Sequence, residues 1–147
     1  MADFIGPVVD WLVGVVTGEA LAELLVAAEL EAFAEVKQSW TGVVINWPPV
    51  SVMPRATAFD AEGTAVHGTH GLRIKFGVCG DDPDQIAVDA MAYMKAVDQA
   101  IAASVGTWPA AVSKVFVSRH DYGPLFSRDK GFAKFPELHL EVETYEI

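Results

Sequence analysis

Two histidines and two carboxylates that stand close together in the sequence are the first candidates for chemistry. His67 and His70 are three residues apart, and Asp60 and Glu62 shortly precede them. Two imidazoles and a carboxylate are a common ligand set for zinc. A three-residue spacing aligns two side chains on a helix, however, and glycines interrupt this segment. We therefore interpret it as a polar segment that orders against a partner, and we expect no bound metal.

His120 suggests a second kind of chemistry, because a histidine can act as the base of a nucleophilic hydrolase. Asp121 follows it directly, and Ser118 and Ser127 supply hydroxyl groups nearby. Adjacent side chains on a strand point to opposite faces of the sheet, so His120 and Asp121 are not expected to orient one another. Neither serine stands in the glycine-flanked sharp turn of a nucleophile elbow. These residues therefore do not predict an enzyme.

Nucleotide and cation sites are also unsupported by the sequence. It contains no phosphate-binding glycine motif of the Walker or dinucleotide type, so no nucleotide cofactor is expected. Asp81, Asp82 and Asp84 could bind a cation, but they stand where a helix is predicted to begin. Capping and the helix dipole favour carboxylates at that position. The three aspartates are thus explained without a ligand.

Two further features point to contacts with other proteins. Arg128, Lys130 and Lys134 form a basic cluster in an otherwise acidic chain. Two interpretations of this cluster stay open, a solvated loop and a salt-sensitive contact with an acidic partner. Trp47, which precedes two prolines, is a candidate interface residue because aromatic side chains are favoured at subunit interfaces.

The composition limits the class of protein. The 147 residues are 52% hydrophobic, which suits one domain with a packed core and excludes wholesale disorder. The formal net charge of −10 disfavours tight binding of nucleic acid. A lone cysteine, Cys79, excludes an internal disulfide. The apolar run from Val8 to Val16 contains Asp10 and is shorter than the roughly 20 residues of a membrane span, so we expect a soluble cytoplasmic product.

The first third of the chain has the composition of helices. Residues 19–37 are rich in Ala, Leu, Glu and Val and predict one helix with an apolar stripe. Residues 8–16 predict either a separate short helix that is broken at Thr17 and Gly18, or the first part of one long helix. Residues 43–45 are a short β-branched run.

The middle of the chain predicts two strands and a helix. Residues 50–59 predict a strand in which Pro54 requires an edge position or a bulge. Residues 60–71 contain several glycines and predict a long loop. Residues 72–78 alternate between apolar and polar side chains, which is typical of a sheet with one buried face. Asp82 and Pro83 then start a helix whose buried stripe is Ile86, Ala90, Met94, Val97 and Ile101.

The last part of the chain predicts two strands, residues 112–119 and 137–147, separated by a second long loop at residues 122–136. The order of elements is therefore α-β-β-α-β-β. We predict an α+β fold in which a mostly antiparallel sheet of about four main strands packs against two main helices. Residues 1–147 are expected to form one domain, with the apolar residues 1–18 as a helical segment available for an interface.

From Trp47 to Ile147 the chain resembles the tail terminator, or tail completion, proteins of long-tailed bacteriophages. The resemblance lies in the proline-bounded strand at residues 49–54, the acidic turn at residues 59–63, the strand after Thr69 and His70, the Gly80-Asp81-Asp82-Pro83 helix start and the final strand. The first 46 residues match only in being helical.

The resemblance implies a structural virion protein and no catalysis. Such a protein forms a hexameric ring at the head-proximal end of the tail tube, ends tube growth and joins the tail to the neck, after assembly in the host cytoplasm. DNA then passes through the lumen without specific binding. We expect the segment with Asp60, Glu62, His67 and His70 to contact the tube protein, and Arg128 and Lys130 to contact a subunit or the neck.

The sequence leaves two alternative functions open. One is a neck or head-closure adaptor, which belongs to the same head–tail connector but to a different layer. The other is a small metal-binding or hydrolytic domain that uses His67 and His70, or His120.

Overall fold

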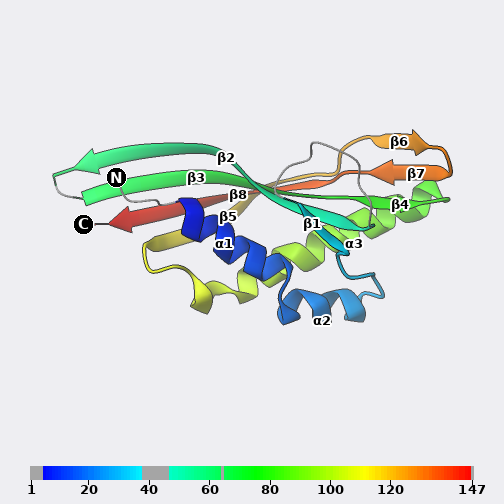
Figure 1. Ribbon diagram of the computed structural model, residues 1–147, viewed down its shortest axis with the longest axis horizontal. Coiled ribbons are helices and arrows are strands. Elements are labelled where there is room, and N and C mark those ends of the chain that lie inside the picture. The colour runs from blue at the N-terminus through cyan, green and yellow to red at the C-terminus, as the bar shows by residue number, and fades with distance from the viewer. Residues whose placement is uncertain (1–4, 38–46, 64, 147) are drawn as a thin grey trace.

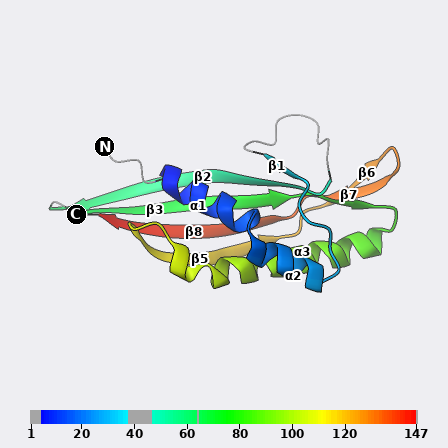
Figure 2. The ribbon, with the colours of Figure 1, turned by 60° about the horizontal axis from the view of Figure 1, so that its bottom comes forward.

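A computed structural model describes residues 5–37, 47–63 and 65–146 of the chain. Long strands lie side by side in one twisted sheet, and the helices lie against one of its two faces (Figure 1; Figure 2). The molecule is elongated along the strand direction. The predicted α+β class, with a mostly antiparallel sheet, is confirmed.

The main sheet has five strands in the order β1-β2-β3-β8-β5. The strands are β1 (Glu35–Lys37), β2 (Pro49–Glu62), β3 (Ala65–Phe76), β8 (Glu137–Glu146) and β5 (Val112–Asp121). The short β1 runs parallel to β2, and the other neighbours are antiparallel. The predicted Pro54 irregularity is confirmed, because the register between β2 and β3 shifts between Pro54 and Ala56.

Three helices supply the apolar layer that buries one face of this sheet. They are α1 (Ile5–Val16), α2 (Glu19–Ala27) and α3 (Pro83–Ala103), and a short 3₁₀ turn, η1 (Val105–Thr107), follows α3. The predicted start of α3 is confirmed, because the Asp82 side chain accepts a hydrogen bond from the Asp84 backbone N–H at 3.0 Å. The predicted stripe is also confirmed as buried: Ile86, Ala90, Met94, Val97 and Ile101.

The sheet contributes the alternating residues that the sequence predicted. The fully buried side chains Leu72, Ile74 and Phe76 of β3 pack against the helices with Leu138 and Leu140 of β8. Each buried side chain of this size contributes about 1.5–3 kcal/mol relative to an exposed one. This shared core fixes which face of each strand points toward the helices.

A second, three-stranded sheet lies at one end of the molecule (Figure 1). Its order is β4-β7-β6, with β4 (Val78–Gly80), β7 (Gly131–Lys134) and β6 (Leu125–Arg128). Gly77 lies between β3 and β4, and a Cβ there would lie 2.8 Å from the Trp47 ring. The chain thus passes from one sheet to the other at a glycine, where the Trp47 ring leaves no room for a side chain.

The prediction of one helix over residues 19–37 is wrong. The helix ends at Ala27, Glu29 adopts a positive φ of 59°, and residues 35–37 form β1. Phe33 packs against the rings of Phe76 and Tyr93 instead of continuing the helical stripe. Helical composition does not reveal such long-range aromatic contacts. The N-terminal alternative is resolved in favour of separate helices, since α1 ends at Val16 and α2 begins at Glu19.

The two predicted long loops are also wrong. Most of residues 60–71 belongs to the β2–β3 hairpin, and residues 122–136 contain the β6–β7 hairpin. Glycines suggested loops, but Gly68 lies inside β3, where a Cβ would come within 2.7 Å of the Thr144 hydroxyl. Its missing side chain makes room for packing, not for a turn. The β-branched run at 43–45 lies outside the described residues.

Candidate interaction surfaces

The β2–β3 hairpin carries the acidic and histidine residues that the sequence analysis assigned to a partner. Asp60 and His67 are direct cross-strand neighbours, and His67 is in turn opposite Tyr145 of β8. All three lie on the sheet face that the helices leave open. The His67 Nε2 atom lies 4.0 Å from a Glu143 carboxylate oxygen. Glu62 ends β2, and the position of its side chain is outside the description.

His70 is buried, which corrects its assignment to a contact surface. Its ring is 0% exposed, with Nδ1 3.1 Å from the Thr57 hydroxyl and Nε2 3.0 Å from the Thr144 hydroxyl. Burial lowers the pKa of His70, because the charged imidazolium loses its hydration. The ring edge also meets Phe59 in a T-shaped contact. His70 therefore joins strands β2, β3 and β8 as a neutral internal group.

The two histidines do not form a metal site together. His70 points toward the helical side of β3, and His67, three residues earlier in the same strand, points to the opposite side. No group of three His, Cys, Asp or Glu side chains with metal-binding geometry occurs within the described ranges.

The far end of the molecule combines basic and aromatic residues. The Arg128 guanidinium lies over the Trp47 ring, 4.5 Å from its centroid, and Trp47 also packs on Phe135 at 5.7 Å. Arg128 ends β6, and Lys130 lies exposed in the turn before β7. Exposed Phe126 continues the aromatic contacts through Phe135. The structure thus joins Trp47 and Arg128, which the sequence presented as separate candidates, into one surface.

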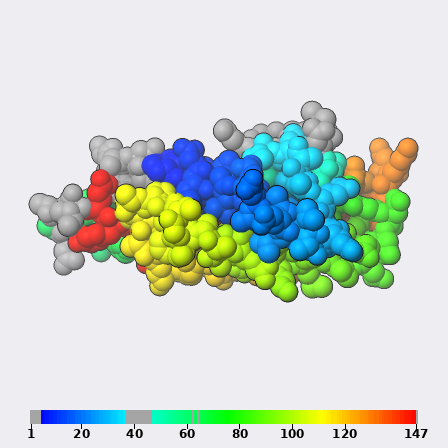
Figure 3. Space-filling view, turned by 90° about the horizontal axis from the view of Figure 1, so that it is seen from below, coloured from blue at the N-terminus to red at the C-terminus, as the bar shows by residue number. Residues whose placement is uncertain are grey.

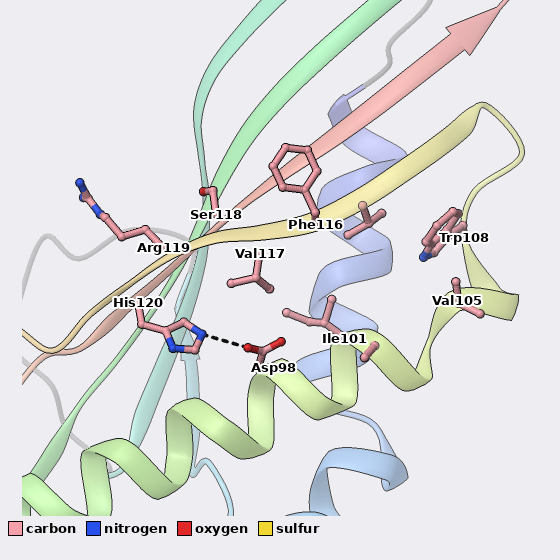
Figure 4. A pocket seen from close by; sticks show the side chains of 11 residues that line it. Asp98, Ile101, Val105, Trp108, Phe116, Val117, Ser118, Arg119 and His120 are labelled. Atoms are coloured by element: carbon pink, nitrogen blue, oxygen red, sulfur yellow. Dashed lines mark hydrogen bonds and ion pairs between the residues drawn. The ribbon is translucent and has the colours of Figure 1, made fainter.

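A groove of about 610 Å³ runs between α3 and β5 (Figure 4). His120 points into it from β5, and its Nε2 atom lies 3.0 Å from Asp98 Oδ2 of α3. Ile101, Val105 and Trp108 form much of its apolar wall. The sequence analysis missed Asp98, because its pairing with His120 depends on how α3 crosses the sheet.

The hydrolase arrangement around His120 does not form. Val117 and His120 both face α3, because the register between β5 and β8 shifts between Val117 and Arg119. Asp121 lies on the opposite face, as the strand alternation predicted. The Ser118 hydroxyl points away from His120 and donates a hydrogen bond to the His139 carbonyl at 3.2 Å (Figure 4). His120 therefore pairs with the Asp98 carboxylate, and the Ser118 hydroxyl is directed to the backbone instead of to His120.

A row of arginines around His139 crosses the open sheet face, and sequence reasoning missed it. Arg55 lies 2.9 Å from His139 Nδ1, and Arg119 lies 3.3 Å from His139 Nε2. Arg73 donates to Glu137 at 3.1 Å. Burial and the Arg119 charge lower the pKa of His139, with a smaller opposing effect of Glu137. The polar positions of the alternating strands were the available signal for this row.

Charge differs between the two faces of the main sheet. The three helices carry six acidic residues and one basic residue, Lys95; the acidic ones are Asp10, Glu19, Glu23, Asp84, Asp89 and Asp98. These helices form most of the face in Figure 3. The helical face is therefore a polyanionic surface, whereas the open sheet face carries mixed charge.

Among the described helices, none has the length and apolar character needed to cross a membrane.

Comparison with known proteins gives one informative result. No family model and no curated protein matches the sequence. Among 27 similar chains of solved structures is one from the virion of a native gene transfer agent (GTA) particle. It is 15% identical to this chain, with a TM-score of 0.56 and coverage of 92% of both chains. The two chains share a fold.

Proposed function

We propose that this chain is a structural protein of a phage-like virion that works through its surfaces and not by catalysis. The observation that carries the proposal is the shared fold over 92% of this chain and 92% of a chain from the gene transfer agent virion. Coverage of this extent matters because it takes in most of both chains. A match restricted to a common core would carry much less weight.

Within that class, the proposed role is a ring at the head-proximal end of the tail tube, which ends tube polymerisation and joins the tail to the neck. The two ends of the elongated molecule differ chemically. The β2–β3 end exposes Asp60 and His67, and the β4-β7-β6 end exposes Arg128 and Lys130 (Figure 1). A subunit with two different ends suits a ring that meets a different partner on each side.

The proposed contacts follow from these two ends. The β2–β3 end, with Asp60, Glu62 and His67, contacts the tube protein. Arg128 and Lys130 at the other end contact a neighbouring subunit or the neck. The Trp47 ring positions Arg128 through their cation–π contact. The net charge of −10 per chain lets DNA pass the ring without being held, because tight DNA binding requires many cationic contacts.

Deletion of the gene from a phage genome that encodes this chain tests the role. A terminator is required to stop the tube, so we expect overlong tails in electron micrographs, and a plasmid copy should restore normal length. Normal tails on capsids that leak DNA would instead identify a neck or head-closure adaptor. Virions that contain none of this chain by mass spectrometry, or an unchanged virion after deletion, would reject a structural role.

A mass measurement of the purified protein tests the ring directly. We expect a hexamer, either alone or after addition of tube subunits, and a stable complex with the tube protein. A chain that stays monomeric under both conditions contradicts the ring.

A further inference from the structure

The α3–β5 groove lies beside an unpaired strand edge. β5 is the last strand of the main sheet, and no strand of the described residues pairs with its outer side. Val105, at the groove wall, is 59% exposed. The Trp108 Nε1 atom, also at the groove, is buried without a hydrogen-bond partner among the described residues. The exposed apolar wall and the open strand edge together favour an incoming strand.

The opposite edge of the sheet offers such a strand. β1 pairs only with residues 49–51 of β2, so no described strand covers the outer edge of β2 from Val52 to Glu62. Phe59 lies on this stretch and is 47% exposed. It stands opposite Gly68, two residues before the inward-facing His70, and therefore points to the helical side of the sheet. That is also the side on which the α3–β5 groove opens.

We propose that β2 of one copy lies along β5 of the next copy and that its Phe59 enters the α3–β5 groove beside Val105 and Trp108. This inference rests on the proposed ring and names the contact that closes it. The occupant is a second copy of this chain, because the two edges belong to one sheet and match each other in direction, position and charge.

The direction follows from the topology. The pairs β2–β3, β3–β8 and β8–β5 are all antiparallel, so β2 and β5 run in opposite directions. Rotation about a ring axis that runs along the strands keeps the direction of every strand along that axis. β2 of the next copy therefore meets β5 in antiparallel orientation, as every long pair within the subunit does.

The position follows from the register. Phe59 is opposite Gly68, Gly68 is opposite Thr144, and Thr144 is opposite Val112 at the start of β5. Rotation in a closed ring introduces no shift along the axis. Phe59 of the next copy therefore lies level with Val112, just after the segment that carries Val105 and Trp108. By the same rule Ala58 lies level with Lys114, through Thr69 and Glu143.

Charge complementarity supports the same pairing. Lys114 and Arg119 are exposed on β5, and Asp60 is exposed on β2. Lys114 and Asp60 both lie on the open sheet face, two positions apart in the proposed pairing. This is the diagonal separation at which long side chains of opposite charge still interact across a strand pair.

Disulfide trapping tests this contact. Ala58→Cys and Lys114→Cys are placed in separate chains on a Cys79→Ala background, which removes the only native cysteine. Both positions are exposed, so folding is preserved, and Phe59 remains in place. Residues directly opposite each other in antiparallel strands come within reach of a disulfide. We expect a cross-linked dimer when the two chains are mixed, and none from either variant alone. Val26→Cys on α2 replaces Ala58→Cys as the matched exposed control.

Phe59→Ala is the second variant. We expect it to weaken self-association by about tenfold in sedimentation experiments, as loss of an aromatic interface anchor does. Val26→Ala, which trims another exposed apolar residue, should have no such effect. Equal cross-linking with the control cysteine, no cross-link in an assembled ring, or unchanged association of Phe59→Ala would overturn the proposed contact. A chain that stays monomeric at all concentrations, both alone and with tube subunits, would overturn it too.

The deletion experiment separates this contact from the proposed function. Overlong tails after deletion, combined with no Ala58–Lys114 cross-link in the assembled ring, reject the contact and leave the terminator role standing. A specific cross-link in a chain that virions do not contain rejects the role and keeps the contact.

Discussion

The Arg128 guanidinium lies 4.5 Å from the centre of the Trp47 ring, although the two residues are far apart in the sequence. The Trp47 ring packs against the Phe135 ring. It also fits closely over Gly77, where a side chain would collide with it. A cation over an indole ring is attracted by the negative face of the aromatic system. The contact fixes the direction in which the β6–β7 hairpin presents its positive charges.

Reversal of charge at Arg128 and Lys130 should separate folding from assembly. Both side chains are exposed, and a cation–π pair at such a position contributes only about 0.5–1 kcal/mol. We therefore expect Arg128→Glu with Lys130→Glu to lower the free energy of unfolding by no more than about 1 kcal/mol in urea titrations. Ring or tail assembly should be strongly impaired, because the partner would meet two negative charges in place of two positive ones.

Lys95→Glu is the matched control for this variant. Lys95 is exposed on α3, away from the β6–β7 hairpin, and its reversal also makes the chain more acidic. Assembly that is lost equally in Lys95→Glu would point to net charge and not to the Arg128 surface. Normal tail length and infectivity in the double variant would contradict the prediction.

The stability of the fold should depend on pH through His70 and His139. Both pKa values are lowered in the folded chain, chiefly by burial. The unfolded chain therefore takes up protons first as the pH falls below about 6.5, and the folded state loses stability. The loss should reach up to about 1.4 kcal/mol per pH unit for each histidine, and it should be absent above pH ~7.

Urea titrations between pH 5 and pH 8 would measure this slope. His70→Gln retains groups that can hydrogen bond to the threonines but does not titrate, so its profile should be flatter than that of the unsubstituted chain. His139→Gln should flatten the remaining slope further. A profile of His70→Gln that runs parallel to the original would show that folding does not shift the pKa of His70.

Two glycines should respond in opposite ways to alanine. A Cβ at Gly68 would lie 2.7 Å from Thr144 Oγ1 and 2.9 Å from His70 Nε2, so we expect Gly68→Ala to destabilise the fold by about 1–3 kcal/mol. A Cβ at Gly14, inside α1, meets nothing within 4 Å. Gly14→Ala should stabilise by about 0.5–1 kcal/mol, because alanine favours helix. Equal effects in thermal unfolding would contradict this description of β3.

The start of α3 should depend on Asp82 and not on its neighbour. Asp82→Ala removes the side chain that accepts the Asp84 N–H, and loss of such a cap costs about 1 kcal/mol. Asp81→Ala removes an equal charge from the residue before the N-cap. Because Asp81 does not cap the helix, this substitution should lower the free energy of unfolding by less. The free energy of unfolding of the two variants provides the comparison.

The sequence by itself determined the elements whose signals are local. The cap at Asp82 with Pro83 at the first turn predicted the beginning of α3, and its four- and three-residue spacings predicted the buried stripe. The alternation of Leu72, Ile74 and Phe76 predicted the buried face of β3. These signals are readable because backbone geometry sets their period within a few residues.

Only the tertiary structure decided the rest, because the deciding contacts join residues that are distant in the chain. Pairing with β2 and β8 turned the glycine-rich segment after Asp60 into strand β3, and it buried His70 between two threonines. A register shift in β5 turned His120 toward Asp98. The choice of strand partners and the place of a register shift leave no periodic trace in the sequence, so no local pattern could have revealed them.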